Sequence, residues 1–231
     1  VRPVAETGPY LRPGRGGIHV SAEVDGQKVQ TLRDLDKETQ LMQDLVSRCP
    51  ALDLLAPVEG QWQAGDPEQA LELLLELKQC QDLVVLKWPQ GEKIRLASPR
   101  SFDKLSLRIQ KDRDWFMATG RLDLDEDLTL DLKKLLTLME KAVGRFIPLD
   151  DGTFISLTHQ LKERLNELQA FTSPHKQGVR FSPLAGFAVA DVVEQAGDLK
   201  ADAAWKAHCK KLRQTTVPEL PGTLQAELRD Y

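Results

Sequence analysis

The chain has 231 residues, of which 41% are hydrophobic and 29% are charged, and it carries a formal net charge of −4. This length suffices for one large domain or two small ones with a buried core. The charge balance excludes a general attraction to nucleic acid or to membranes, so any phosphate-binding surface must be local.

The three cysteines, Cys49, Cys80 and Cys209, lie far apart and form no Cys-x-x-Cys pair. Their number and spacing give no disulfide framework and favour buried free thiols in a reducing compartment. The N-terminus shows no cleavable apolar signal, and no apolar run is long enough to span a bilayer. We therefore expect a cytoplasmic protein without a membrane partner.

The first predicted elements are a loop and a hairpin. Residues 1–17 contain three prolines and four glycines, which predicts a flexible N-terminal segment. Apolar and polar residues then alternate over 18–24 and stop at Asp25-Gly26, a pattern typical of a strand that ends in a tight hairpin turn.

Two helices are expected after this hairpin. Residues 31–48 have helical spacing of apolar side chains, and Pro50 ends that helix. The second helix begins at Asp66-Pro67, because Asp66 can cap the backbone and Pro67 occupies a position that needs no amide hydrogen.

Two further hairpins are predicted, over 83–96 and over 105–124. The second turns at 111–114, and its apolar residues recur with a period of two. This pattern predicts an antiparallel sheet with one buried face. The elements expected next are a helix over 128–143, a hairpin over 146–155 and a helix capped by Thr158.

The last part of the chain is predicted to be helical. Residues 173–178 break the preceding pattern and are interpreted as a linker. Helices are predicted over 184–196 and 202–214, and a proline-rich joint follows at 217–222. The expected fold class is α+β, with antiparallel β-hairpins packed by amphipathic helices and followed by a small helical connector.

The C-terminal segment 223–231 starts with Thr223 as a helix cap, but no Gly, Asn or basic last turn ends the helix. We therefore expect the chain to be a fragment. Its run Leu228-Arg229-Asp230-Tyr231 resembles the start of the ATPase core of Swi/Snf-type DNA-dependent ATPases, in which a Leu-Arg-x-Tyr-Gln segment carries the Gln that reads adenine. By this resemblance Arg229 and Tyr231 border the adenine-reading motif, and its Gln is missing here.

Two stretches in the middle are similar to the accessory region that precedes this ATPase core in bacterial members of the family. Those members show Trp-Phe with a Gly two to four residues on, which matches Trp115, Phe116 and Gly120. They also show Arg-Phe-hydrophobic-x-Leu-x-Asp-Gly-x-Phe, which matches 145–154. The order of these motifs carries the resemblance, which covers about 102–231.

The resemblance implies a non-catalytic accessory fragment of a bacterial Swi/Snf-type ATP-dependent DNA translocase or helicase, which docks on or regulates the motor. The implied partners are its own ATPase lobes and duplex DNA. The fragment would hold no cofactor, whereas the missing motor domain would bind ATP and Mg²⁺. The expected division is 1–17 as the flexible N-terminal segment, 18–172 as the accessory domain, 173–222 as linker and helical connector, and 223–231 as the truncated start of the ATPase lobe.

The sequence offers no set of catalytic or metal-binding residues. Gly14-Arg15-Gly16-Gly17 lacks the Gly-Lys-Ser/Thr ending of a phosphate loop. The acidic series 123–131 has Leu128 where a calcium loop needs Gly and Lys134 where it needs Glu, which favours solvated carboxylates. The four histidines do not pair at ligand spacing. We expect no enzymatic activity from the fragment itself.

The predicted helix 202–214 carries the candidate DNA-binding residues, with Trp205 between them: Lys206, Lys210, Lys211 and Arg213. Cations along one helix edge can neutralise duplex phosphates, although a solvated outer face is the alternative. Lys200 belongs to the same basic cluster, and Lys176 and Arg180 would extend it if the predicted linker folds back.

A second candidate is a stacking platform for single-stranded nucleic acid at Arg113, Trp115 and Phe116. The strand phase assigns Phe116 to the core, whereas Trp115 has the opposite phase and stays a candidate. The alternative function is a protein-interaction module that recruits the motor to a partner complex. A self-contained enzyme is the third possibility, and no convergent set of titratable groups favours it.

Overall fold

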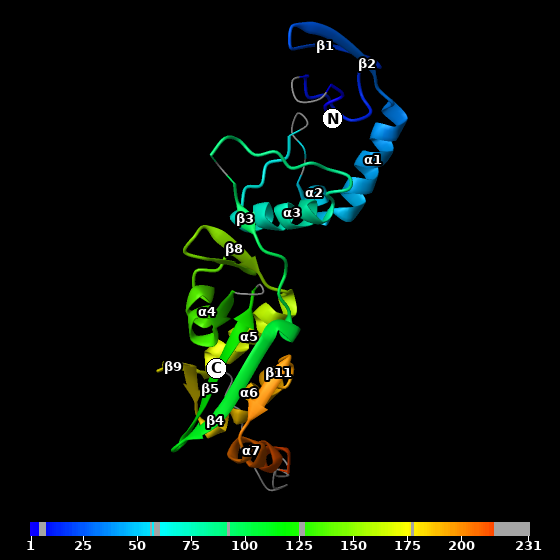
Figure 1. Cartoon of the computed structure of the whole chain (residues 1–231). Coiled ribbons are helices and arrows are strands. Elements are labelled where there is room, and N and C mark those ends of the chain that lie inside the picture. The colour runs from blue at the N-terminus through cyan, green and yellow to red at the C-terminus, as the bar shows by residue number, and fades with distance from the viewer. Residues whose placement is uncertain are drawn as a thin grey trace, which may run out of the picture. The chain divides into compact units, whose positions relative to one another are not determined.

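The computed structural model describes residues 1–4, 8–55, 57, 61–91, 93–124, 128–176 and 178–214. It confirms the predicted α+β fold class, with helices and sheets mixed along the chain (Figure 1). The chain divides into two compact units: unit 1 comprises Val1–Ser98 with Pro148–Phe154, and unit 2 comprises Pro99–Ile147 with Ile155–Tyr231. The division therefore runs through the predicted range 18–172. The predicted joint 217–222 and terminal helix 223–231 lie outside the described residues.

Unit 1 starts with the predicted hairpin, formed by β1 (His19–Val24) and β2 (Gln27–Leu32). Its turn residues Asp25 and Gly26 have φ angles of 50° and 76°, the left-handed geometry that fits the twist of a two-residue hairpin. Three helices follow: α1 (Leu35–Arg48), α2 (Pro50–Leu54) and α3 (Pro67–Gln79). The side chains of Asp34 and Asp66 accept backbone hydrogen bonds in the first turns of α1 and α3, as helix caps do.

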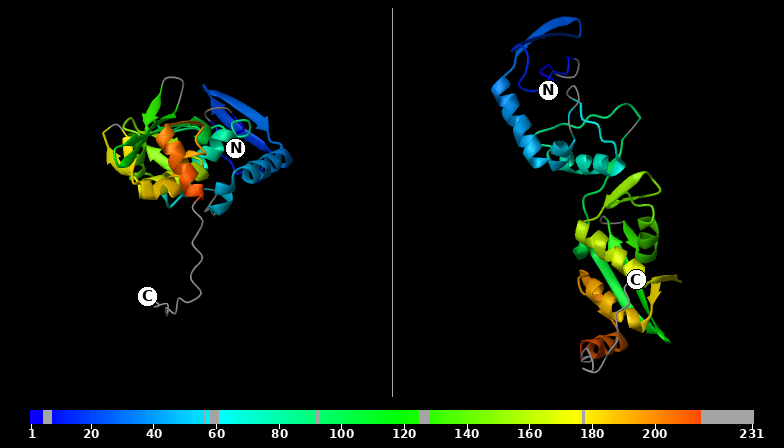
Figure 2. Two further views of the ribbon diagram at one scale, coloured as in Figure 1. Left: turned by 90° about the horizontal axis from the view of Figure 1, so that it is seen from below. Right: turned by 180° about the vertical axis from the view of Figure 1, so that it is seen from behind.

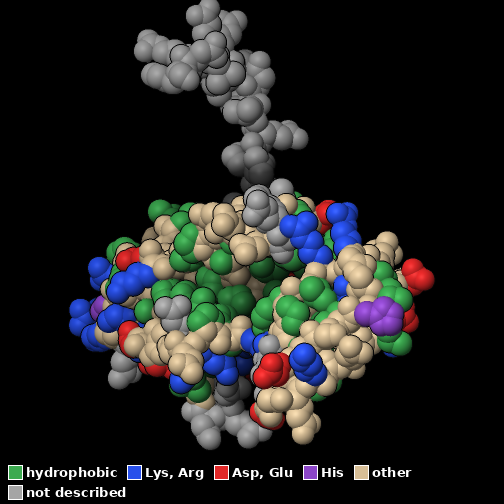
Figure 3. Space-filling model, turned by 90° about the horizontal axis from the view of Figure 1, so that it is seen from above, with side chains coloured by type: hydrophobic (Ala, Val, Ile, Leu, Met, Phe, Trp, Pro, Cys, Tyr) green, Lys and Arg blue, Asp and Glu red, His purple; other side chains and the backbone are tan. Residues whose placement is uncertain are grey.

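The core of unit 1 includes Cys49, Leu52 and Cys80, which are 0%, 6% and 1% exposed. The Sγ atoms of the two cysteines are 3.5 Å apart, and both thiols are free. Some large apolar side chains of unit 1 stay on the surface, among them Tyr10 and Leu54. Figure 3 shows hydrophobic, cationic and anionic side chains interspersed over one face of the molecule.

The N-terminal segment of unit 1 is tied to α1 by Arg33, whose side chain is 1% exposed. Its guanidinium donates to the carboxylate of Glu38 at 2.9 and 2.5 Å. It also donates to the backbone carbonyls of Arg12 and Arg15, at 2.9 and 2.8 Å. The backbone N–H of Gly14 donates to Glu38 at 3.0 Å. A glycine-rich stretch that the sequence suggests to be flexible therefore has specific tertiary hydrogen bonds.

The predicted hairpin over 83–96 does not form in the described part of that range. The backbone N–H groups of Leu83 and Val84 donate to the carbonyl of Cys80, so the chain continues α3 as a turn. Val84 packs against the cysteine core instead of pairing in a sheet. Only β3 (Arg95–Leu96) is a strand, and it pairs in parallel with β8 (Thr153–Ser156), which forms a hairpin with β7 (Phe146–Pro148).

Unit 2 is built on a six-stranded sheet. Its central hairpin is the one predicted over 105–124 and joins β4 (Leu105–Asp112) and β5 (Trp115–Asp123). The strand order is β11-β4-β5-β10-β9, and β6 also pairs with β5. The other strands are β6 (Thr129–Asp131), β9 (Ser173–His175), β10 (Gly178–Phe181) and β11 (Asp198–Ala201). β11 pairs in parallel with β4, and the other pairs of this sheet are antiparallel.

One face of this sheet is buried, and its strands contribute Leu105, Leu107, Ile109, Phe116, Ala118, Leu122, Val179 and Phe181 to the core. Figure 2, seen from behind, shows α5 and α6 in front of β4 and β5, whereas Figure 1 shows these helices behind the strands. The helices of unit 2 are α4 (Leu132–Met139), α5 (His159–Phe171), α6 (Gly186–Val193) and α7 (Ala203–Gln214), with short turns η1 (Phe102–Lys104) and η2 (Pro183–Ala185). The Thr158 side chain caps α5 as predicted.

Gly120 on β5 lies where the sheet leaves no room for a side chain. A Cβ atom at this position would lie 2.4 Å from the Ser106 carbonyl oxygen and 2.6 Å from the Leu107 side chain. Such contacts are far below van der Waals distance, so any larger residue would push β4 and β5 apart. A glycine at this point allows the hairpin strands to pack closely.

Two predicted segments differ in the structure. The described residues of the predicted linker 173–178 belong to the β9–β10 hairpin at the sheet edge, with Lys176 at a φ of 33°. The helix predicted from residue 128 begins at Leu132, because 129–131 pair with β5 as β6. In both cases the pairing of a short strand with a neighbouring strand replaces the structure that the local pattern suggests.

Candidate nucleic-acid interface

The second face of the six-stranded sheet is open, and its side chains are polar. The register places Arg108 on β4 opposite Thr119 on β5 and opposite Lys200 on β11. It likewise places Ser106 opposite Arg121 and Asp198. We call this surface the sheet face: the outward residues of β4, β5, β10 and β11. The alternation that buries Leu107 and Phe116 is the same alternation that directs these cations outward.

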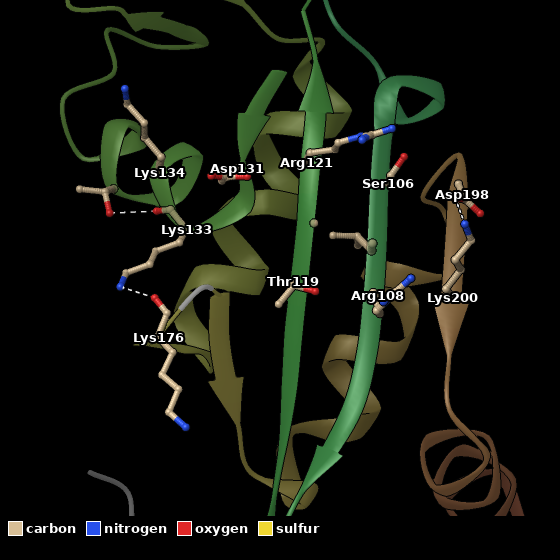
Figure 4. A pocket seen from close by; sticks show the side chains of 13 residues that line it. Ser106, Arg108, Thr119, Arg121, Asp131, Lys133, Lys134, Lys176, Asp198 and Lys200 are labelled. Carbon is tan, nitrogen blue, oxygen red and sulfur yellow. Dashed lines mark hydrogen bonds and ion pairs between the residues drawn. The ribbon is translucent and has the colours of Figure 1, made fainter. Parts of the chain in front are cut away.

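A hollow of about 830 Å³ lies on the sheet face beside α4. Six cationic side chains line it: Arg108, Arg121, Lys133, Lys134, Lys176 and Lys200. Two carboxylates, Asp131 and Asp198, line it as well, which leaves a net charge of +4 around the hollow. Figure 4 shows these side chains coming from α4, from β5 and β4, and from β11. A concentration of positive charge on a chain with a net charge of −4 marks this surface as distinct.

The cations are held in place by few strong bonds. Lys133 Nζ donates to the backbone carbonyl of Lys176 at 2.8 Å, which links α4 to the β9–β10 turn. Lys200 lies 3.5 Å from Asp198, and Arg121 lies 3.3 Å from Asp123. The side chains of Lys200 and Arg121 are 65% and 61% exposed, so these ion pairs are weak and a phosphate can replace the carboxylate partner.

Lys206 connects the sheet face to α7. Together with Arg108 and Lys200 it lines a neighbouring hollow of about 410 Å³. The Asp202 side chain positions this end of α7, because it accepts hydrogen bonds from the backbone of Trp205 at 2.8 Å and of Lys111 at 2.7 Å. Of the predicted DNA-binding residues, Lys206 is therefore the one that shares a described hollow with the sheet-face cations.

The other predicted DNA-binding residues lie elsewhere on α7. Lys210 and Arg213 line a hollow of about 520 Å³ together with Lys206, Trp205 and Cys209, and Arg213 pairs with Glu194. Lys211 is exposed. Three of the four predicted residues therefore share one hollow on α7, and Lys206 belongs to this hollow and to the one beside the sheet face.

Trp205 does not lie among these cations as an exposed ring. It is 3% exposed and packs edge-on against Phe116 and Phe181, with ring centroids 5.0 and 5.4 Å apart. The His208 ring lies 5.2 Å from that of Phe116, and its Nε2 is 2.8 Å from the Pro183 carbonyl oxygen. These side chains fix α7 on the buried face of the sheet, so Trp205 is a core residue.

Trp115 lies at the start of β5 on the sheet face and is 42% exposed, whereas its neighbour Phe116 is 3% exposed. This confirms the opposite phases of the two residues. The guanidinium carbon of Arg180 lies 5.0 Å from the centroid of the Trp115 ring, a cation–π contact. Trp115 lines a fourth hollow of about 380 Å³, of which Arg113, His175 and Lys176 are also part.

Some predicted positions lie outside the described residues: Arg229, Tyr231 and the middle of the acidic series at 125–127. Within the described ranges, no group of three or more His, Cys, Asp or Glu residues is placed to hold a metal ion. The helices that the structure describes include none with the length and apolar character needed to cross a bilayer.

Comparisons of this chain with known protein families, with curated proteins and with solved structures gave no match. The sequence interpretation names Lys176, Arg180 and Lys200 among its basic residues but omits Arg108 and Arg121 of the sheet face and Lys133 and Lys134 of α4. A signal was present, because Arg108 and Arg121 occupy the polar phase of the two strands with the clearest alternation.

Proposed function

We propose that the chain is a non-catalytic accessory region of a bacterial, cytoplasmic Swi/Snf-type DNA translocase, and that it contacts the DNA backbone through the sheet face. The observation that carries the DNA part is the 830 Å³ hollow with its net charge of +4. The motor part rests on the resemblance of 114–120 and 144–157, which form β5 and the region around the β7–β8 hairpin.

The chemistry of the sheet face suits phosphates better than base edges. The cations around the hollow come from β4, β5, β11, α4 and the β9–β10 turn, and Ser106, Thr119 and Thr137 add hydroxyl groups. Contacts of Lys, Arg, Ser and Thr with phosphate oxygens fix a protein on DNA without reading its sequence. We therefore propose binding that depends on salt and is independent of base sequence.

The proposed mechanism is mechanical. The accessory region holds DNA next to the two ATPase lobes of the motor, which bind ATP and Mg²⁺ and perform the hydrolysis. Coupling to the motor arises if the region binds the open and closed arrangements of the lobes with different affinity. The chain itself takes no part in the chemistry.

A protein-interaction module is the second candidate, and one observation favours it. Leu184 of η2 and Phe187 of α6 are 93% and 63% exposed, although both are large apolar residues. Exposed apolar side chains that lie close together in the chain are typical of surfaces that bind another protein. This surface is separate from the sheet-face cations and is compatible with them.

The test of the proposed function is duplex binding by charge-reversed variants. We expect Arg108→Glu with Lys200→Glu to abolish binding of a labelled duplex in a fluorescence anisotropy titration. The matched control is Lys28→Glu with Lys37→Glu, two exposed lysines of unit 1, which changes the net charge equally. The pair Lys210→Glu with Lys211→Glu tests the α7 surface. Equal losses in all three variants would contradict a localised sheet-face site.

A further inference from the structure

We infer that Trp115 stacks on an unpaired nucleobase, so that the ligand of the sheet face is duplex DNA with a single-stranded extension. This inference rests on the proposed function and specifies its ligand. Its basis is an exposed indole ring at the end of a positively charged surface. Nucleobases stack on such rings in proteins that bind single strands, and nearby cations hold the phosphates.

The position of Trp115 is not explained by core packing. The residue lies opposite Asp112 at the tip of the β4–β5 hairpin, on the open face, and is 42% exposed. Its ring borders the 380 Å³ hollow, around which Arg113, Lys176 and Arg180 supply three positive charges against Asp112 and Asp114. This hollow offers an aromatic surface and phosphate-binding groups together.

Arg180 prepares the indole for stacking. Its guanidinium carbon lies 5.0 Å from the ring centroid, and the strand register places Arg180 opposite Met117 on the same face as Trp115. A guanidinium near the ring restricts its motion, and its plane is itself a surface on which a base can stack. The pair therefore offers a base two flat groups next to a positive charge.

Lys176 connects the two hollows, because it lines both the 830 Å³ hollow and the hollow at Trp115. A DNA strand whose phosphates lie along the sheet face would therefore pass Lys176 and reach the tip of the β4–β5 hairpin. Bases in a duplex have no free face there, whereas the bases of an extension do. The combined surface therefore favours a junction between duplex and single strand over a blunt duplex.

The experiment compares a blunt labelled duplex with the same duplex carrying a thymidine overhang, by fluorescence anisotropy. For the unmodified chain we expect the overhang to tighten binding about tenfold, the typical effect of stacking one base. Trp115→Ala should abolish this gain, whereas Trp115→Phe should keep most of it. Circular dichroism of each variant verifies the fold.

The outcomes separate this inference from the proposed function. The inference is wrong if the overhang gives no gain or if Trp115→Ala keeps the gain, even when the blunt duplex binds through Arg108 and Lys200. If the blunt duplex does not bind at all, the proposed function fails. A single-stranded oligothymidine then decides the inference, since binding that Trp115→Ala removes supports the stacking site and no such binding overturns it.

Discussion

The salt dependence of DNA binding follows directly from the charges around the sheet-face hollow. Neutralising a number Z of phosphates gives a slope of log K against log salt of about −0.9 Z. If the net charge of +4 corresponds to four phosphates, the slope is about −3.6. Raising the salt from about 50 to about 200 mM should then weaken binding on the order of 150-fold.

Replacing Arg108 and Lys200 by Gln removes two of these charges and tests the same reasoning quantitatively. The slope should become about −1.8, and the same change in salt should weaken binding only on the order of tenfold. The assay is anisotropy of a labelled duplex over a series of salt concentrations. Lys28→Gln with Lys37→Gln serves as the control and should leave the slope at its original value. A slope that is equally steep in both double variants would refute the assignment of phosphate contacts to the sheet face.

Two further predictions concern the three cysteines and the Arg33–Glu38 pair. Burial raises the pKa of the Cys49 thiol to about 12, and Cys80 is equally buried, whereas Cys209 is only half-buried. At about pH 8, a disulfide reagent should therefore modify Cys209 first, and Cys49 and Cys80 only after unfolding. Mass spectrometry of the digested protein measures this order. Early labelling of Cys49 would contradict its burial in the core. The hydrogen bond from Arg33 holds the pKa of Glu38 below its ordinary value of 4.5. The contribution of this ion pair to the free energy of unfolding is complete above pH 4.5 and disappears as the pH falls through the lowered pKa of Glu38. Glu38→Gln should therefore reduce the loss of stability at acid pH, measured as the midpoint of thermal unfolding at several pH values. An unchanged loss at acid pH would contradict this.

The central hairpin could be predicted from sequence because both of its faces are encoded locally. The period of two in β4 and β5 assigns Phe116 to the core, and the structure confirms this. The same period gives Trp115 the opposite phase, and in the structure its side chain is exposed. Helix caps at Asp66 and Thr158 were equally predictable, because a cap involves residues within one turn of each other. The interactions that define these elements join residues that are close together in the sequence.

Elements that depend on distant partners could not be predicted. β11 pairs in parallel with β4, and the paired residues Asp198 and Ser106 are about ninety residues apart in the sequence. The sequence of 198–201 does not indicate which strand β11 pairs with. The hydrogen bonds of Arg33 to the carbonyls of Arg12 and Arg15 are also invisible in a sequence pattern. Arg108 and Arg121 were left out of the predicted basic patch for the same reason. Charges on one helix are visible locally, whereas the sheet face gathers cations from segments that only the fold brings together.

The discontinuity of unit 1 limits how the protein can be dissected. The chain leaves this unit after Ser98 and returns to it with Pro148–Phe154, where Thr153 and Phe154 pair with Arg95 and Leu96. A polypeptide cut after residue 98 would therefore lose the strand that β3 pairs with. To produce unit 1 alone, residues 148–154 would have to be joined to the end of a chain that stops at Ser98. In a simple deletion series, a loss of activity could therefore result from misfolding of unit 1.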